Sequence, residues 1–297
     1  MCLTVWKSKR YRIIQKNEMK DRIWNMLFCL LVSSVVLVGA HYARRILWFD
    51  QFVIPTHSME PTLLAGDRIW VDKTLMGPRI YRCFDFEEGD PLVCTRLKGR
   101  REVRPNDVIV FNFPYGWKNR EIAFRLNRLY AKRCIGCPGD SVGIRNGWFV
   151  NNHHPGVMGD AGCQAAFESM DDESIGERFL KPGWMHCADT TWTIRDFGPI
   201  YVPGAGDNLP LNAVSRALYS EIIAFETGTG PDSTMEWYTF RGNWYFACGD
   251  NVASSNDSRH WGFVPEDFIV GIAARISFSR DPDTGRRRPG RFLRPIY

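Results

Sequence analysis

The longest apolar segment of the chain lies near its start. Residues 23–40, IWNMLFCLLVSSVVLVGA, contain no charged side chain, and only one Asn and two Ser interrupt them. Such a run predicts a helix long enough to span a bilayer with little tilt. A cleaved secretory signal is the alternative, because the small residues at 38–40 resemble a cleavage site. A retained anchor is favoured, since the run exceeds the ~7–15 apolar residues typical of a secretory signal.

Beyond residue 52 the pattern changes to short alternating or apolar segments, such as DVIVFNFP and NWYFACGD, which Gly, Pro, Asn and Asp separate. This spacing favours antiparallel β-structure over helical bundles. Residues 209–225 differ, because apolar side chains recur at helical spacing from Leu211 to Ile222, behind possible caps at Asp207 and Asn208. The expected fold is therefore mostly β: one N-terminal transmembrane helix, then an antiparallel β core with an inserted cap region that contains a short helix.

This pattern divides the chain into five expected parts. They are a basic tail at 1–22, a transmembrane anchor at 23–43, the first part of the β core at 44–150, the inserted cap region at 151–235, and the second part of the core with the C-terminal tail at 236–297.

The net charge is concentrated ahead of the anchor. Residues 1–22 hold seven Lys or Arg against two acidic residues, which equals the whole net charge of +5. The other 275 residues carry 31 basic and 31 acidic side chains, so no nucleic-acid partner is expected. Because basic residues flanking a membrane helix stay in the cytoplasm, the N-terminus is predicted to be cytoplasmic and the body extracytoplasmic.

Three separated sequence blocks carry the candidate chemistry. They are FVIPTHSMEPTLLAGDRIWVDK at 52–73, YAKRCIGCPGDSV at 130–142 and CGDNVASSNDSRHWGFVPEDFIVGIA at 248–273. In this order they resemble type I signal peptidase, the bacterial leader peptidase, a membrane-anchored Ser/Lys endopeptidase that removes signal peptides from exported proteins. The resemblance covers the anchor and roughly residues 50–150 and 240–280, and FGPIYVPGAGD at 197–207 suggests a Bacteroidetes-like variant.

The resemblance implies a single-pass enzyme of the inner (plasma) membrane with its active site on the periplasmic side. It would cleave preproteins after small residues of the Ala-x-Ala type, at the lipid bilayer, as a monomer and without a cofactor. A conjugation-pilus propeptide peptidase of the same class and a catalytically inactive, membrane-tethered β binding domain remain alternatives. A self-cleaving Ser/Lys repressor is disfavoured, because the chain has an anchor in place of a DNA-binding headpiece.

By this resemblance Ser58 is the nucleophile and Lys132 is the general base. A lysine in water titrates near ~10.4, so its amine is a poor base at neutral pH. Apolar neighbours such as Tyr130 and Ile135 are expected to desolvate Lys132 and favour the neutral amine. That amine can take the hydroxyl proton of Ser58 and pass it to the leaving amine.

Four further residues complete the expected catalytic machinery. The resemblance assigns the Thr56 hydroxyl, together with the Ser58 backbone N–H, to the oxyanion. It assigns Ser255 to orienting the lysine amine, and Asp257 with Arg259 to a supporting ion pair. Stabilisation of the loop alone is an equal alternative for that ion pair.

Four residues match the positions that line the substrate pockets in this family: Ile54, Pro55, Met59 and Ala131. The resemblance implies that an extended signal-peptide segment adds as a strand, with small side chains in pockets at P1 and P3. Ala131 stands where Ile is common, which predicts room for a somewhat larger substrate side chain.

His57 is an alternative base beside Ser58. Neighbouring residues of an extended segment point to opposite sides, so its imidazole is not expected to reach the Ser58 hydroxyl.

The chain contains nine cysteines. Cys134 and Cys137 form a CxxC motif, but no second Cys or His pair stands at ligand spacing, so no metal site is expected. Both are interpreted as packing residues. Cys163 and Cys187 are a possible disulfide in the inserted region.

Overall fold

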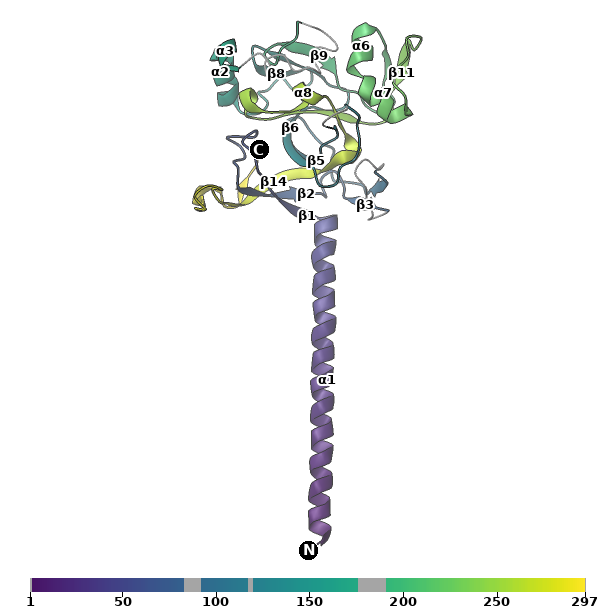
Figure 1. Cartoon of the computed structure of the whole chain (residues 1–297), viewed down its shortest axis with the longest axis vertical. Helices are drawn as coiled ribbons and strands as arrows, with labels where there is room; N and C mark the ends of the chain where they lie inside the picture. The colour runs from purple at the N-terminus through teal and green to yellow at the C-terminus, as the bar shows by residue number, and fades with distance from the viewer. Residues whose placement is uncertain (1, 83–91, 117–119, 176–190, 297) are drawn as a thin grey trace. The chain divides into compact units, whose positions relative to one another are not determined.

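The computed structural model describes residues 2–82, 92–116, 120–175 and 191–296 (Figure 1). Two compact units, Met1–Ile46 and Leu47–Tyr297, make up the chain. The first is formed by helix α1 (Cys2–Leu47), which takes in the basic tail as well as the apolar run. Its segment Met19–Leu47, 29 residues, is long and apolar enough to cross a membrane, and at 1.5 Å per residue it measures about 44 Å. The predicted N-terminal apolar helix is confirmed.

The second unit is built on an eight-stranded antiparallel sheet. Seven strands follow one path, and β15 (Arg294–Pro295) pairs with β14 beside it. In spatial order they are β1 (Phe49–Val53), β2 (Asp67–Asp72), β14 (Ile269–Ser279), β5 (Val108–Asn112), β6 (Leu129–Gly136), β12 (Trp244–Cys248) and β13 (Val264–Pro265). Every side chain of β5 and β12 is buried, as expected of central strands with continuous apolar sequence.

Smaller sheets and short helices complete this unit. The strands are β3 (Arg79–Tyr81) with β4 (Cys94–Arg96), β7 (Ser141–Arg145) between β8 (Trp148–Asn151) and β9 (Phe197–Tyr201), and β10 (Asn208–Pro210) with β11 (Trp237–Thr239). The helices are α2 (Ala161–Ser169), α3 (Asp172–Ile175), α6 (Ala213–Leu218), α7 (Ser220–Thr227) and α8 (Ser258–Trp261), with 3₁₀ turns η1 (Val252–Ser254), η2 (Glu266–Phe268) and η3 (Pro289–Arg291). The predicted class, mostly antiparallel β with short helices, is confirmed.

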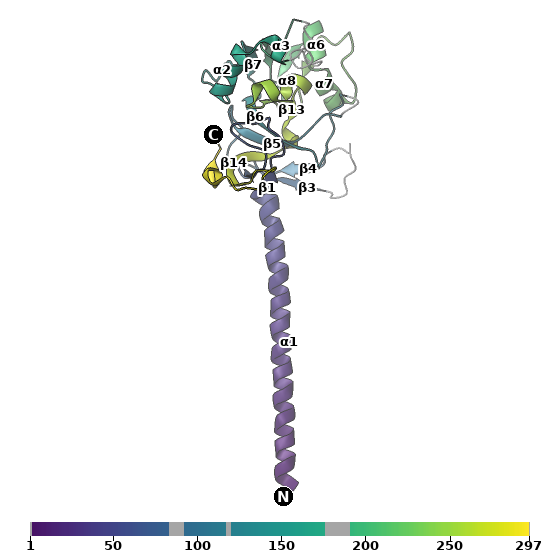
Figure 2. The same ribbon diagram turned by 60° about the vertical axis from the view of Figure 1, so that its left-hand side comes forward.

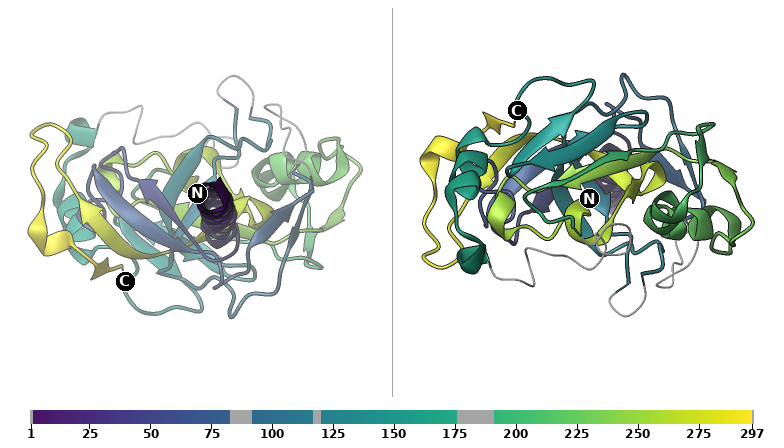
Figure 3. Two further views of the ribbon diagram at one scale, coloured as in Figure 1. Left: turned by 90° about the horizontal axis from the view of Figure 1, so that it is seen from below. Right: turned by 90° about the horizontal axis from the view of Figure 1, so that it is seen from above.

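The inserted residues gather at one end of the folded body. In Figures 1 and 2, α2, α3, α6 and α7 lie at the end away from β1 and β2. Figure 3 shows the C-terminal residues in yellow and α6 with α7 in green at opposite sides of this body in both views.

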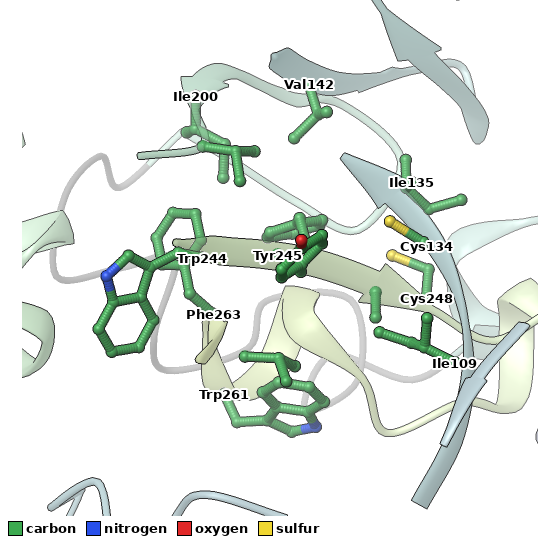
Figure 4. Close-up of a cluster of buried hydrophobic side chains, with 14 of the residues drawn as sticks. Ile109, Cys134, Ile135, Val142, Ile200, Trp244, Tyr245, Cys248, Trp261 and Phe263 are labelled. Atoms are coloured by element: carbon green, nitrogen blue, oxygen red, sulfur yellow. The ribbon is translucent and has the colours of Figure 1, made fainter. Parts of the chain in front are cut away.

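The main hydrophobic core joins the inserted residues to the sheet (Figure 4). Val142 of β7 and Ile200 of β9 lie opposite each other in register and face the strand that carries Tyr245. Ile109 of β5 and Ile135 of β6 belong to the same buried cluster. Ile200 lies within the inserted region, so this region has no separate core of its own there.

Residues 209–225 do not form one helix, and the predicted caps were wrong. The helix begins after Asn212, whose side chain accepts the Ser215 N–H at 2.9 Å in a capping box. Asn208 lies in β10 and pairs with Thr239 of β11. The Asp207 carboxylate accepts the Gly204 N–H at 2.6 Å and so serves a turn. Helix α6 ends at Leu218, and α7 continues after the intervening Tyr219.

Candidate active site

Ser58 lies on a loop whose two ends are fixed between β1 and β2. The Ile54 N–H bonds to the Asp67 carbonyl, and the Gly66 N–H bonds to the Ile54 carbonyl, both at 2.8 Å. Met59 and Leu63 are buried at 1% and 0% exposure, and they anchor the loop in a second hydrophobic cluster. The hydrogen-bonded ends and the buried side chains of the loop therefore hold Ser58 in position.

Gly66 makes the closure of this loop possible. Its φ of +87° lies in the left-handed region, and a Cβ there would stand 1.9 Å from the Arg280 carbonyl oxygen. Only glycine has both the conformational freedom and the small size for this position.

Lys132 extends from the middle of β6, opposite Ile109 of β5. Its Nζ contacts the Ser58 hydroxyl and donates a hydrogen bond to Ser255 Oγ at 3.1 Å. The residue is only 2% exposed. The sheet and the loop after β12 thus bring together three polar groups that lie far apart in the sequence.

Burial lowers the pKa of Lys132 to about 8. The nearby Asp257 carboxylate opposes this shift, and the Arg259 guanidinium supports it. Because these two groups carry opposite charges, their effects offset each other and desolvation decides the direction. The site therefore favours a neutral amine at a much lower pH than water does.

Asp257 and Arg259 form an ion pair that is completely buried, with both side chains at 0% exposure. Arg259 donates to both carboxylate oxygens, at 2.8 and 2.7 Å, and the Gly249 N–H adds a bond of 2.9 Å. Burial opposes ionisation, yet Arg259 holds the pKa of Asp257 well below its ordinary value. Asp257 also caps α8 by accepting the Arg259 N–H, so the pair fixes the loop behind Ser255.

Gly249 lets this loop approach the nucleophile. A Cβ at Gly249 would stand 2.2 Å from Ser255 Oγ and 2.3 Å from the Ser58 carbonyl oxygen. Asn251 then binds the nucleophile loop directly: its N–H donates to the Ser58 carbonyl and its Nδ2 to the His57 carbonyl, both at 3.2 Å. The sequence does not indicate this contact, because both acceptors are backbone carbonyls.

A second buried ion pair was not predicted from the sequence. Arg133 donates through Nε and Nη2 to the two carboxylate oxygens of Asp250, each at 2.6 Å, with side-chain exposures of 3% and 0%. It ties the residue next to Lys132 to the loop after β12. Both residues stand in the quoted blocks, since Arg133 follows Lys132 in residues 130–142 and Asp250 lies near the start of residues 248–273.

A cleft of about 470 Å³ opens beside Ser58 and Lys132. Its lining consists of Ile54, Pro55, Thr56, His57, Ser58, Met59, Leu129, Tyr130, Ala131, Lys132, Ser254 and Asn256. All four residues expected to line the substrate pockets are among them. Thr56 Oγ1 lies 3.4 Å from Ser58 Oγ, and Ser255 reaches the lysine amine from outside the lining set.

The His57 imidazole pairs with Glu60, whereas Lys132 contacts the Ser58 hydroxyl. His57 Nδ1 lies 2.6 Å from Glu60 Oε1, and the His57 side chain is 70% exposed. The imidazole is therefore held by Glu60 at the rim of the cleft.

Among the described residues, no cysteine lines the cleft. Across the described residues no cluster of three or more His, Cys, Asp or Glu side chains is arranged to hold a metal ion. Cys134 is fully buried and Cys137 is half-buried. The possible partner of Cys163, Cys187, lies outside the described residues.

Comparisons with known proteins identify the family. The sequence profile described as signal peptidase, peptidase S26, matches residues 27–278. Signal peptidase I of Buchnera aphidicola is 26% identical over 259 residues, covering 84% of this chain and 75% of that protein. Signal peptidase I of Rickettsia bellii is 27% identical over 290 residues, covering 93% of this chain and 83% of that protein. A crystal structure of a signal peptidase I from Enterococcus faecalis is 20% identical, covers 58% of this chain and 96% of its own, and has a TM-score of 0.27. Because the family profile spans well over half of its length, this chain belongs to the signal peptidase family, peptidase S26.

Proposed function

We propose that this chain is a membrane-bound serine endopeptidase that removes signal peptides from exported preproteins, with Ser58 as nucleophile and Lys132 as general base. The observation that carries the proposal is the buried Lys132 amine in contact with the hydroxyls of Ser58 and Ser255. A lysine with an ordinary pKa would be protonated at neutral pH, whereas burial lowers the pKa of Lys132 to about 8. The amine is thus suited to accept a proton from Ser58.

The chemical steps follow from this arrangement. Neutral Lys132 accepts the Ser58 proton while Ser58 Oγ attacks the carbonyl carbon of the scissile bond. The Ser58 N–H and the Thr56 hydroxyl donate to the oxyanion that forms. Protonated Lys132 then gives its proton to the departing amine, and water later hydrolyses the acyl-enzyme with the amine again as base. Ser255 keeps the amine aimed at Ser58, and the Asp257–Arg259 pair holds the loop of Ser255.

The cleft is suited to an extended peptide with small side chains. Ile54 and Pro55 follow β1, Met59 follows Ser58 in the loop, and Ala131 lies on β6, so a substrate strand would run between residues 54–59 and β6. Apolar lining at these positions favours small apolar residues at P1 and P3, which agrees with cleavage of the Ala-x-Ala type.

The proposed setting is the inner membrane, with α1 crossing once and the basic tail in the cytoplasm. The body then meets preproteins at the outer surface of the bilayer, as a monomer. We propose the same five-part division of the chain. The Bacteroidetes-like variant is proposed on residues 197–207 alone. In this segment the Tyr201 hydroxyl bonds to Asp207 at 2.8 Å.

The test is cleavage by the purified full-length chain in detergent. A preprotein with an Ala-x-Ala site is incubated with the protein, and the new N-terminus is mapped by mass spectrometry. We expect one cut after the second Ala, no cut with Ser58→Ala, and no cut in a matched preprotein with Phe at P1. A pilus propeptide cut in preference to the preprotein would favour the alternative peptidase function, and no cut in either would contradict the proposal.

A further inference from the structure

The CxxC motif has no part in the proposed mechanism. Cys134 lies in β6, two residues after Lys132, and Cys137 follows the end of the strand. Their sulfur atoms lie 3.6 Å apart, and both are free thiols in the structure. The sequence suggested simple packing, but this distance puts the two sulfur atoms in van der Waals contact with each other.

The backbone on both sides of the pair is already fixed. The Cys134 N–H bonds to the Asp107 carbonyl at 2.7 Å, and the Cys134 carbonyl accepts the Asn106 N–H at 2.8 Å. The Cys137 N–H bonds to Asp140 Oδ2 at 2.8 Å. Since a disulfide bond is about 2.05 Å long, side-chain rotation and a small shift must bring the sulfurs together by about 1.5 Å.

Solvent reaches the two thiols unequally. Cys134 is 0% exposed, whereas Cys137 is half-buried at the surface. Burial also raises the pKa of the Cys134 thiol well above its ordinary value. Because the thiolate is the attacking species in thiol–disulfide exchange, Cys137 is the residue that meets an oxidant first.

Cys248 is the competing partner for Cys134. It ends β12, the neighbour of β6 in the sheet, and Figure 4 draws its side chain near that of Cys134. Cys248 is also 0% exposed, so neither Cys134 nor Cys248 can meet an external oxidant. The half-buried position of Cys137, the most accessible of the three, therefore favours the Cys134–Cys137 pairing.

We propose that Cys134 and Cys137 form a disulfide when the folded body meets the oxidising side of the membrane, and that this bond braces the strand that carries Lys132. The oxidant is a disulfide of a small thiol or of a thiol oxidoreductase. Cys137 attacks it to form a mixed disulfide and release one thiol. Cys134 then attacks the Cys137 sulfur and releases the second thiol. Two cysteine S–H bonds and the S–S bond of the oxidant break, one S–S bond forms between the cysteines, and the two released thiols carry away the two protons and two electrons.

The bond acts as a brace and does not switch the enzyme on or off. Lys132 already contacts Ser58 while both cysteines are thiols, so the dithiol form is competent. The inference rests on the proposed function only for the extracytoplasmic location that supplies the oxidant. Its expected effect is on stability, since a cross-link reduces the conformational freedom of the unfolded chain.

The test uses the purified full-length chain, incubated with reduced or oxidised glutathione and then blocked with iodoacetamide in denaturant. Trypsin cuts after Arg133 and Arg145, which releases residues 134–145 with both cysteines and no other. After oxidation this peptide should be unalkylated and about 2 Da lighter than the dithiol form. The oxidised chain should unfold about 4–8 °C higher, with cleavage activity within about twofold of the reduced chain. Cys137→Ser should abolish the temperature difference, and the control Cys94→Ser should keep it.

Three results would overturn the inference. One is a peptide that stays fully alkylated at every glutathione ratio. Another is a mass that links 134–145 to 242–259, the tryptic peptide of Cys248. The third is an oxidised chain that unfolds at the same or a lower temperature, which would exclude the brace. The mass readout does not depend on cleavage, so it stands even if the chain cuts no preprotein.

Discussion

Two carboxylates organise two regions of the body in different ways. Asp257, in the candidate active site, is completely buried and compensates a full positive charge on Arg259. Glu226, at the end of α7 in the inserted region, accepts neutral donors instead: the Tyr238 hydroxyl at 2.7 Å, the Arg241 and Gly242 N–H groups at 2.9 and 3.0 Å, and Trp244 Nε1 at 3.0 Å. Both fix loops to the sheet, but only Asp257 belongs to the electrostatic surroundings of Lys132.

This difference has a functional consequence. Hydrogen bonds from neutral donors to Glu226 can hold the inserted region in place without placing a charge beside Lys132. A buried ion pair beside the lysine both fixes the loop and leaves desolvation to determine the pKa of the amine. Changes around Glu226 in the inserted region should alter stability alone, and changes around Asp257 in the candidate active site should alter stability and catalysis together.

The largest effect is expected from the proposed catalytic pair. Ser58→Ala and Lys132→Met should each lower kcat/KM by at least about 10³-fold, because each removes a group needed for nucleophilic attack. Lys98→Met, at an exposed lysine, is the matched control and should keep full activity. Substantial turnover by Lys132→Met would contradict the role of the amine.

Asp257→Asn should destabilise the body by about 3–5 kcal/mol, because it leaves the Arg259 cation buried without a counter-charge. Activity should fall at temperatures where the variant remains folded. Denaturant unfolding and kcat/KM measure the two effects. If the single variant does not fold, Asp257→Asn with Arg259→Met should recover part of the stability. An additive loss in that double variant would show that the two charges are not coupled.

Glu226→Ala should cost about 1–3 kcal/mol of unfolding free energy, since several donors lose their acceptor. We expect kcat/KM to stay within about twofold of the original value. Unfolding in urea and peptide cleavage on the same samples measure this. A loss of kcat/KM as large as that of Asp257→Asn would remove the distinction between the two regions.

Ala131→Ile should have the smallest effect, on selectivity rather than rate. Added side-chain volume in the cleft should disfavour larger residues at P3 or P1 by about 1–3 kcal/mol per methylene. Profiling a peptide library with both forms measures the change. Identical preferences would show that residue 131 does not contact the substrate.

The sequence predicts the fold class and the candidate site better than it predicts the contacts between them. Continuous or alternating apolar runs predict the β core, and an uncharged run predicts α1. The motifs single out Ser58, Lys132 and Ser255, yet 74 and 123 residues separate the lysine from its two hydroxyl partners. Only the antiparallel pairing of the strands brings such distant residues together.

The contacts that were missed share a physical reason. Asn251 binds backbone carbonyls, and Glu226 binds donors from several segments, so neither leaves a pattern in the sequence. The helical spacing over 209–225 was real, but a β pair at its start and a local capping box at Asn212 determine where the helices begin. Tertiary contacts and capping thus override a periodic pattern at its ends.

The most direct test of the lysine mechanism is the pH dependence of kcat/KM from pH 5 to 10, measured with an uncharged peptide substrate. Only the neutral amine can accept the Ser58 proton, so kcat/KM should rise with pH and level off above a midpoint near the Lys132 pKa of about 8. His57→Asn should leave this midpoint unchanged. A midpoint near that of histidine, about 6.5, that disappears in His57→Asn would contradict the Ser58–Lys132 mechanism.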